Sequence, residues 1–332
     1  MEKPPPKFAS KLLLALASVL FFLCLLEAAS RLYFNRALER HPEYLRELLV
    51  EPDSRCIYRL RPGVSVKDAR VLKFDRYFRP TVELRVDVSV NSKGFRDEEF
   101  SRKPPGVKRV FCLGDSITYA EEVAARDAYP KVLERLLGGK AEVINAGVFG
   151  YSTLQILGRL EEVLGYEPDV VVIQFPVNNA GREAVPDREL VGRSVGLSRL
   201  LHKSRLFFLL SRFFGRTGRR GDVIRVQPEE SRAHLEAMAK LCRERGVKVI
   251  FLFPAHQPWQ PEYDFPVLRP QYLRGLRQVA ARYNIEVLDM QRKLEELGLD
   301  ALLVDDCHLT KEGHRQVAEA LLPAVREALG GD

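Results

Sequence analysis

Five short apolar runs that alternate with amphipathic helical patterns constrain the fold of this chain most. The runs are Arg109–Leu113, Glu142–Ile144, Val170–Ile173, Val249–Phe253 and Glu286–Leu288. The helical patterns lie between or after them, near Tyr129–Leu137, Thr153–Leu164, Ser231–Arg245, Gln271–Tyr283 and Lys311–Leu329. Strands that are apolar throughout and alternate with helices predict a parallel sheet covered on both faces. Ligands bind such sheets at the carboxyl ends of the strands, so the polar residues that follow each run are candidate site residues.

The first run ends in Gly114-Asp115-Ser116, which raises the question of what the serine does. Ser116 at the end of a buried strand is either a nucleophile or, together with Asp115, a cap of the next helix. A nucleophile needs a base, an orienting acid and donors for an oxyanion, and the rest of the chain has to supply them.

The segment "DDCH" just before the last helical pattern contains a candidate base and acid. Asp305, three residues ahead of His308, can accept from the imidazole N–H, which leaves the other ring nitrogen free to take a proton from Ser116. Asp306 is an alternative orienting acid, although its spacing is awkward. A metal site of Asp305, Asp306, Cys307 and His308 is disfavoured because ligands this crowded rarely reach one ion.

Two further segments after strands carry candidate oxyanion donors, although either is also explained as a turn. "NAGVFGYS" contains Gly147, whose backbone can approach a ligand closely and offer its N–H. "FPVNNAG" contains Asn178, whose side chain can donate to a developing oxyanion. His256 in "FPAHQP" also follows a strand and is a candidate cleft residue.

The order GDS, NAG, N and DxxH resembles the SGNH or GDSL-type hydrolase family over about two thirds of the chain. The resemblance implies a flavodoxin-like three-layer α/β/α domain with a five-stranded parallel sheet, ester hydrolysis, and neither metal nor cofactor. It also implies the catalytic triad Ser116, Asp305 and His308, with an oxyanion hole formed by Ser116, Gly147 and Asn178. The chain departs from the usual Gly-x-Asn-Asp block, having Pro176-Val177-Asn178-Asn179, which leaves the geometry of this loop open.

These residues predict a serine esterase that works through an acyl-enzyme. From its presumed location we expect it to act on O-acyl groups of a cell-envelope glycan. An O-acyltransferase that uses the same residues is the first alternative, and a non-catalytic glycan-binding relative is the second. The partners expected are a small-molecule or glycan ester and a membrane, with no nucleic acid, because no nucleic-acid-binding motif is present. The sequence leaves the oligomeric state open.

The N-terminal segment Leu12–Leu26 has fifteen residues with one polar side chain, Ser18, and lysines before it. Its length is typical of a signal peptide, but the helical pattern continues through Phe34, and Glu27 is placed to pair with Arg31. We expect an uncleaved membrane anchor with an extracytoplasmic catalytic domain; a cleaved signal and a buried soluble helix are the alternatives. The stretch from Glu27 through "NSKGFRD" resembles a membrane-anchored bacterial subgroup of the family.

The expected organisation is an anchor or signal peptide at 1–34, an accessory helix and β region at 35–106, and the hydrolase domain at 107–332. Within the accessory region Val82–Val90 alternates like a half-exposed strand, and Gly94, Phe95 and Arg96 are expected to dock it on the hydrolase domain.

A basic insertion is expected at about 182–226. The stretch from Arg193 to Arg225 has nine basic residues and one acid, whereas the whole chain has a net charge of +7, so the excess charge is local. Leu197, Leu200, Leu201 and Phe208 recur at helical spacing. We expect an ordinary cap helix with a solvated basic face, and a lid or membrane-surface helix is the alternative.

Overall fold

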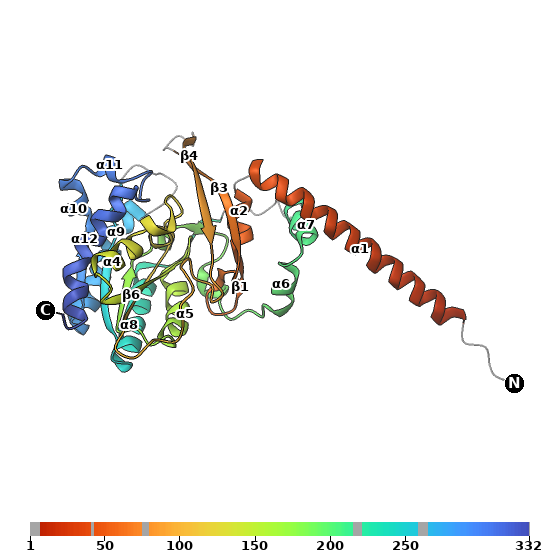
Figure 1. The fold of residues 1–332 in the computed structure, drawn as a ribbon. Helices are drawn as coiled ribbons and strands as arrows, with labels where there is room; N and C mark the ends of the chain where they lie inside the picture. The colour runs from red at the N-terminus through yellow and green to blue at the C-terminus, as the bar shows by residue number, and fades with distance from the viewer. Residues whose placement is uncertain (1–6, 41–42, 75–79, 215–220, 258–264, 332) are drawn as a thin grey trace.

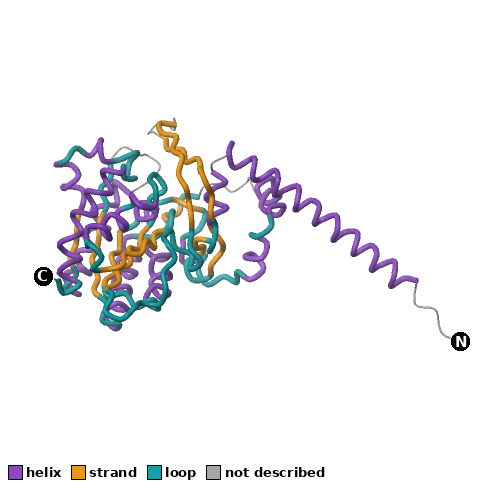
Figure 2. The backbone as a smooth tube through the Cα atoms, in the orientation of Figure 1, coloured by secondary structure: helices purple, strands orange, loops and turns teal. Residues whose placement is uncertain are grey.

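The computed structural model describes residues 7–40, 43–74, 80–214, 221–257 and 265–331. Its centre is a parallel five-stranded sheet in the order β11-β10-β7-β5-β6 (Figures 1 and 2). The strands are β5 (Lys108–Gly114), β6 (Ala141–Gly147), β7 (Val170–Gln174), β10 (Lys248–Phe253) and β11 (Glu286–Asp289). All five predicted strands are confirmed, and this strand order is the flavodoxin-like one.

Helices cover both faces of the sheet, which gives the predicted three layers. On one face α8 packs against α5 and α9, and on the other face α12 packs against α4. These helices are α4 (Tyr129–Leu136), α5 (Thr153–Leu164), α8 (Pro228–Glu244), α9 (Phe265–Tyr283) and α12 (Lys311–Ala328). Short helices α3 (Ser116–Tyr119), α10 (Met290–Glu296) and α11 (Leu299–Leu302) and the 3₁₀ turns η1 (Ala125–Asp127), η2 (Val177–Ala180) and η3 (Asp187–Glu189) lie in the connections.

The observed helices agree with the sequence patterns, apart from two that start earlier. Helix α8 begins at Pro228, because a proline is well accommodated in the first helical turn. Helix α9 begins at Phe265 and contains Pro270, where the sequence pattern had suggested a start at Gln271.

The N-terminal segment forms α1 (Lys7–Arg40), which projects from the body of the molecule (Figure 1), and α2 (Glu43–Leu49) follows it. Residues 41 and 42, between these two helices, lie outside the described residues. The apolar side chains in the outer half of α1 are exposed, for example Leu13 at 71% and Leu20 at 64%, whereas Phe34 is buried. Helix α1 is long and apolar enough to cross a membrane over Ser10–Asn35.

The accessory β region consists of two antiparallel pairs that pack on the domain of the central sheet. The pairs are β1 (Val50–Asp53) with β2 (Ile57–Leu60), and β3 (Ser65–Phe74) with β4 (Pro80–Ser89), which is the predicted alternating strand. Phe95 is fully buried and contacts the rings of Phe111 and Tyr166. Its docking role is therefore confirmed, and the region shares one continuous core with the sheet.

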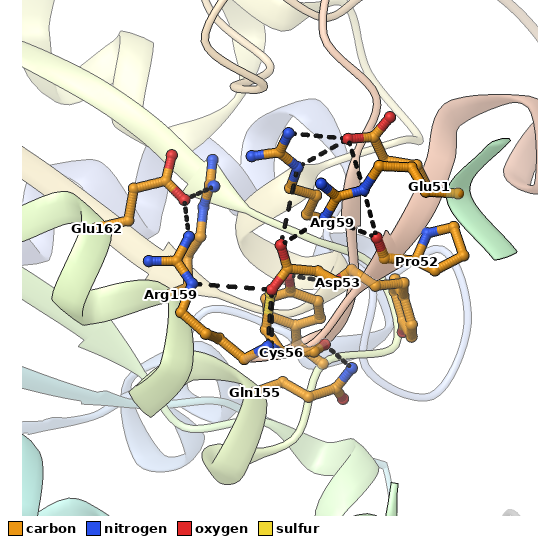
Figure 3. Close-up of polar contacts among 12 residues, drawn as sticks. Glu51, Pro52, Asp53, Cys56, Arg59, Gln155, Arg159 and Glu162 are labelled. Carbon is orange, nitrogen blue, oxygen red and sulfur yellow. Dashed lines mark hydrogen bonds and ion pairs between the residues drawn. The ribbon is translucent and has the colours of Figure 1, made fainter. Parts of the chain in front are cut away.

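A polar network attaches the β1–β2 hairpin to helix α5 (Figure 3). Gln155 Nε2 donates to the carbonyl oxygen of Cys56 at 3.0 Å, and Arg59 pairs with Glu51 at 2.9 Å. The buried Arg159 donates to Glu162 at 2.6 Å and to the carbonyl oxygen of Gly94 at 2.8 Å. Because α5 follows β6 directly, the accessory region is fixed close to the carboxyl edge of the sheet.

The basic insertion starts and ends at a two-residue antiparallel pair, β8 (Arg182–Glu183) with β9 (Val223–Ile224). It contains two helices, α6 (Gly196–Leu201) and α7 (Arg205–Phe214), so the single helical repeat expected from Leu197 to Phe208 is wrong. The expectation of an ordinary cap helix is also wrong for α6, because Leu197 and Leu200 are 70% and 64% exposed.

Candidate active site

The turn after β5 presents Ser116 because Asp115 takes over the capping role. Asp115 Oδ1 accepts from the N–H of Ile117 at 3.0 Å, and α3 begins at Ser116. Gly114 has to be a glycine, since a Cβ there would lie 2.2 Å from Thr118 Oγ1 and 2.4 Å from Gln174 Oε1. The Ser116 hydroxyl is thus left available for another partner.

That partner is His308, which the loop before α12 brings to the carboxyl edge of the sheet. His308 Nε2 lies 2.7 Å from Ser116 Oγ, and His308 Nδ1 lies 2.7 Å from Asp305 Oδ2. Asp305 Oδ1 also accepts from the backbone N–H groups of Cys307 and His308, at 3.1 and 2.8 Å. The loop therefore folds Asp305 back onto the imidazole, and the serine, histidine and aspartate form one hydrogen-bonded chain.

Asp306 and His256 form a separate buried pair behind this chain. His256 Nε2 lies 3.1 Å from Asp306 Oδ2, and both residues are about 95% buried. Asp305, and not Asp306, is therefore the carboxylate in contact with His308 Nδ1. Although the ligand atoms of residues 305–308 lie within 4.8 Å of one another, both ring nitrogens of His308 already contact Asp305 and Ser116, which disfavours a metal there.

Asn178 is held beside Ser116 by the same carboxylate that caps α3. Asp115 Oδ2 accepts from Asn178 Nδ2 and from the backbone N–H of Val177, each at 3.0 Å. The amide nitrogen of Asn178 has two N–H groups, so one remains to donate elsewhere. Burial raises the pKa of Asp115 to about 6, and the hydrogen bonds from Ile117, Val177 and Asn178 oppose that rise.

The structure contradicts the expectation that the Gly147 N–H is available for an oxyanion. This N–H donates to Asn145 Oδ1 at 3.0 Å. Gly147 is a glycine because β6 runs against α3, where a Cβ would lie 2.3 Å from the backbone nitrogen of Tyr119.

Three residues further on, Gly150 has a φ of +75° and lines the same pocket as Asn178. Among the described residues, the N–H of Gly150 makes no hydrogen bond.

Asn179, where the family pattern has aspartate, is fully buried and well satisfied. Its Oδ1 accepts from the N–H of Thr153 at 2.8 Å, and its Nδ2 donates to Ser231 Oγ at 3.0 Å. An ionised aspartate has no proton to donate, so with aspartate here the Ser231 hydroxyl would have to be the donor. Pro176 caps η2 with an ordinary φ of −80°. The departures in this block thus leave Asn178 in contact with the nucleophile turn.

Glu122 was missed by the sequence reasoning, and Arg96, which was expected only to dock the accessory region, also reaches the helix that follows Ser116. Glu122 is buried, and its Oε1 lies 3.7 Å from His308 Nε2. Arg96 is buried and donates to the carbonyl oxygens of Tyr119, Ala120 and Val123, the last at 2.9 Å. The signal for Glu122 was a pair of acids in an otherwise apolar stretch six residues after Ser116.

An open pocket of about 720 Å³ adjoins Asn178. Its walls come from the β1–β2 hairpin, the loops after β6 and β7 and the base of the insertion, and they include Tyr58, Gly150, Arg182, Asp187, Asp222 and Arg225. Arg225 is fixed by Asp187 at 2.9 Å and by the carbonyl oxygen of Gly150 at 2.8 Å. The pocket therefore presents charged side chains beside apolar ones, and segments outside the central sheet build most of it.

Comparison with known proteins assigns the class. The model of the GDSL-like lipase/acylhydrolase family matches residues 112–316, and the chain belongs to this family. It is accordingly a hydrolase that acts on ester bonds. No curated protein matches the chain.

Several solved structures are similar to the chain at low sequence identity. The lipase/acylhydrolase from Enterococcus faecalis is 22% identical with a TM-score of 0.47, and the alignment covers 67% of this chain and 96% of that one. An acetylxylan esterase from Geobacillus stearothermophilus is 18% identical with a TM-score of 0.47, covering 70% and 98%. The acetyl xylan esterase AlAXEase is 21% identical with a TM-score of 0.46, covering 65% and 99%.

Proposed function

We propose that the protein is a serine esterase whose nucleophile, base and orienting acid are Ser116, His308 and Asp305. The observation that carries this proposal is the chain of two 2.7 Å contacts from Ser116 Oγ through His308 to Asp305. A serine hydroxyl is a weak nucleophile by itself, and an imidazole held in the correct tautomer by a carboxylate is the group that activates it.

In the proposed mechanism His308 Nε2 takes the proton of Ser116 as Oγ attacks the ester carbonyl carbon. The carbonyl π electrons move to the oxygen, and Asp305 stabilises the imidazolium that forms. When the tetrahedral intermediate collapses, the bond to the alkoxy oxygen breaks and His308 gives its proton to the departing alcohol. Water then attacks the acyl-enzyme by the same route, releasing the acid and restoring Ser116.

We assign the oxyanion donors to the backbone N–H of Ser116, the second N–H of Asn178 Nδ2, and the N–H of Gly150. Gly150 takes the place predicted for Gly147, because the N–H of Gly147 is occupied by Asn145. Gly150 and Asn178 line one pocket, which supports donation from both into a shared space. Each such donor lowers the barrier by about 3–4 kcal/mol in comparable sites.

The pocket next to Asn178 favours an ester with a polar alcohol, such as an O-acyl group on a cell-envelope glycan. The charged side chains of Arg182, Asp187 and Arg225 lie in its walls, and sugar hydroxyls bind to charged groups more readily than a long acyl chain does. We propose that the insertion at 182–226 and the accessory region at 35–106 supply these walls, while 107–332 supplies the reacting groups.

We further propose that residues 1–34 anchor the enzyme in a membrane and are not cleaved. Glu27 Oε1 and Oε2 accept from the N–H groups of Arg205 and Leu206, each at 3.0 Å, so Glu27 of α1 caps helix α7. Cleavage near Ala28-Ala29-Ser30 would remove that cap. The extracytoplasmic position of the catalytic domain stays a prediction from the sequence.

Reaction of the full chain with a fluorophosphonate, followed by peptide mass spectrometry, tests the assignment of the nucleophile. We expect one modified serine, Ser116, and loss of labelling in a His308→Ala variant that keeps the wild-type circular dichroism spectrum. Labelling at another serine, or labelling that is independent of His308, would overturn the triad. Acetate release from an O-acetylated glycan then tests the substrate class, with a long-chain p-nitrophenyl ester as the comparison substrate.

A further inference from the structure

We infer that α6 and α7 form a membrane-surface platform that lies in the headgroup region of an anionic bilayer beside the point where α1 enters it. We define the platform as residues 196–214. This inference rests on the proposed function only in taking α1 as a membrane anchor. It adds a second membrane contact, and this contact fixes how the catalytic body stands on the bilayer.

The platform meets α1 where the apolar run of α1 ends. All large apolar side chains from Leu12 to Leu25 of α1 are exposed. Partial burial against the rest of the protein begins at Leu26 and Glu27. Glu27 caps α7, and Arg31 donates to the carbonyl oxygen of Lys203 at 3.2 Å. A hydrocarbon core is spanned by about 17–25 helical residues, so its boundary falls close to Glu27 and the platform lies at interface depth.

The platform is held firmly to the body, so its exposed apolar side has a defined direction. Arg199 donates to the carbonyl oxygen of Pro52 at 3.1 Å and contacts Asp53 at 3.3 Å. Phe208 packs its ring edge-on against Phe34 of α1 and Tyr44 of α2, at centroid distances of 5.2 and 5.6 Å. Figure 1 shows α6 and α7 between the body and α1, on the side from which α1 departs.

Most of the large side chains left exposed in the described part of the platform are apolar, and the charged residues of its sequence are basic. Leu197, Leu200, Leu210 and Phe213 are exposed by 70%, 64%, 46% and 79%. From Leu190 to Phe214 the sequence has five basic residues and no acidic one. Apolar side chains flanked by arginine and lysine are the pattern of helices that lie in an anionic lipid interface, and single exposed leucines elsewhere lack this combination.

The test reconstitutes the full chain in vesicles of phosphatidylcholine and phosphatidylglycerol with brominated acyl chains, which quench tryptophan at close range. A Trp259→Phe background removes the single native tryptophan. Leu200→Trp and Phe213→Trp probe the platform. Leu20→Trp probes the anchor, and Val267→Trp is the matched control. Val267 is 74% exposed on α9, and Figure 1 shows α9 on the opposite side of the body from α1.

We expect loss of emission from Leu200→Trp, Phe213→Trp and Leu20→Trp, and unchanged emission from Val267→Trp. Quenching of Leu20→Trp alone would overturn the platform and leave the anchor intact. Absence of quenching in Leu20→Trp would overturn the anchor, and the platform with it. Neither result depends on catalysis, so a failure here is distinct from a failure of the esterase assignment.

Discussion

Asn178 Nδ2 donates to Asp115 Oδ2 at 3.0 Å, so the residue before the proposed nucleophile holds the proposed oxyanion donor. The same carboxylate caps α3 through Ile117 and anchors the loop after β7 through Val177. Strands β5 and β7 are adjacent, and the strand order reverses between them, which is where ligands bind in open α/β sheets. Asp115 thus joins the two sides of the site.

The Asp115→Asn variant is expected to misplace Asn178 without removing a reacting group. We predict that kcat on p-nitrophenyl acetate falls roughly tenfold to a hundredfold. This loss should not exceed the loss in Asn178→Ala. Because both changes act on one donor, the double variant should lose less than the product of the two single losses. Fully independent losses in this cycle would contradict the positioning role of Asp115.

Glu122 places a second carboxylate near the imidazole that becomes positively charged during catalysis. A neighbouring anion favours the charged imidazole, so Glu122→Gln should lower kcat and move the acid limb of the kcat/KM profile to lower pH. The surface variant Glu161→Gln, in the middle of α5, serves as the control and should leave the profile unchanged. An unaltered acid limb in Glu122→Gln would assign Glu122 to packing only.

Arg96 supports the C-terminal end of α3 from the accessory region. Arg96→Met removes the guanidinium that three carbonyl oxygens share, and hydrogen bonds to charged groups contribute about 1.5–3 kcal/mol each. We expect a loss of about 3 kcal/mol or more in the free energy of unfolding, measured by thermal unfolding in mild detergent. The exposed Arg102→Met is the control, and an equal effect of the two variants would exclude a supporting role for Arg96.

His314 makes the protein sensitive to acid by staying neutral when folded. Burial lowers the pKa of His314 to about 3, whereas an unfolded histidine titrates near its ordinary pKa of about 6.5. Between these values the unfolded chain binds a proton that the folded chain does not, so stability falls as the pH drops through this window. The raised pKa of Asp115 makes stability rise as the pH drops through its own window. This contribution is common to the wild type and to the His314 variant described next.

His314→Gln removes this titration and retains an acceptor for the N–H of Tyr129. We predict that the melting temperature of the wild type falls more than that of the variant between about pH 7 and about pH 5. Parallel declines of the two melting temperatures would show that another group causes the acid sensitivity.

The strands and most helices were predictable because burial on both faces of the sheet demands continuous apolar runs such as Val170–Ile173. The contacts of Ser116, His308 and Asp305 were also anticipated, since order along the chain and strand ends place them at one edge. The prediction that the Gly147 N–H would serve the oxyanion was wrong, because a sequence does not reveal that this N–H donates to Asn145. Glu122 was missed for a similar reason, because its position comes from contacts across the fold and not from a local pattern. Arg96 was expected to dock the accessory region, but the sequence did not reveal which carbonyl oxygens it binds.

The insertion shows what hydrophobic periodicity alone does not predict. Leucines and phenylalanines at helical spacing predicted one packed helix, but the helix is interrupted at residues 202–204. Of the two helices that result, only α7 packs closely on α1 and α2. Spacing predicts that a face is apolar, and it does not say whether protein or lipid covers that face.

The most direct test of the account is the rate of p-nitrophenyl acetate hydrolysis by the full chain in mild detergent, compared with Ser116→Ala. We predict turnover in the wild type and a loss of at least about a thousandfold in kcat for the variant, with unchanged circular dichroism. Equal rates in the two proteins, or no turnover by a folded wild type, would contradict the claim that Ser116 is the nucleophile of an esterase.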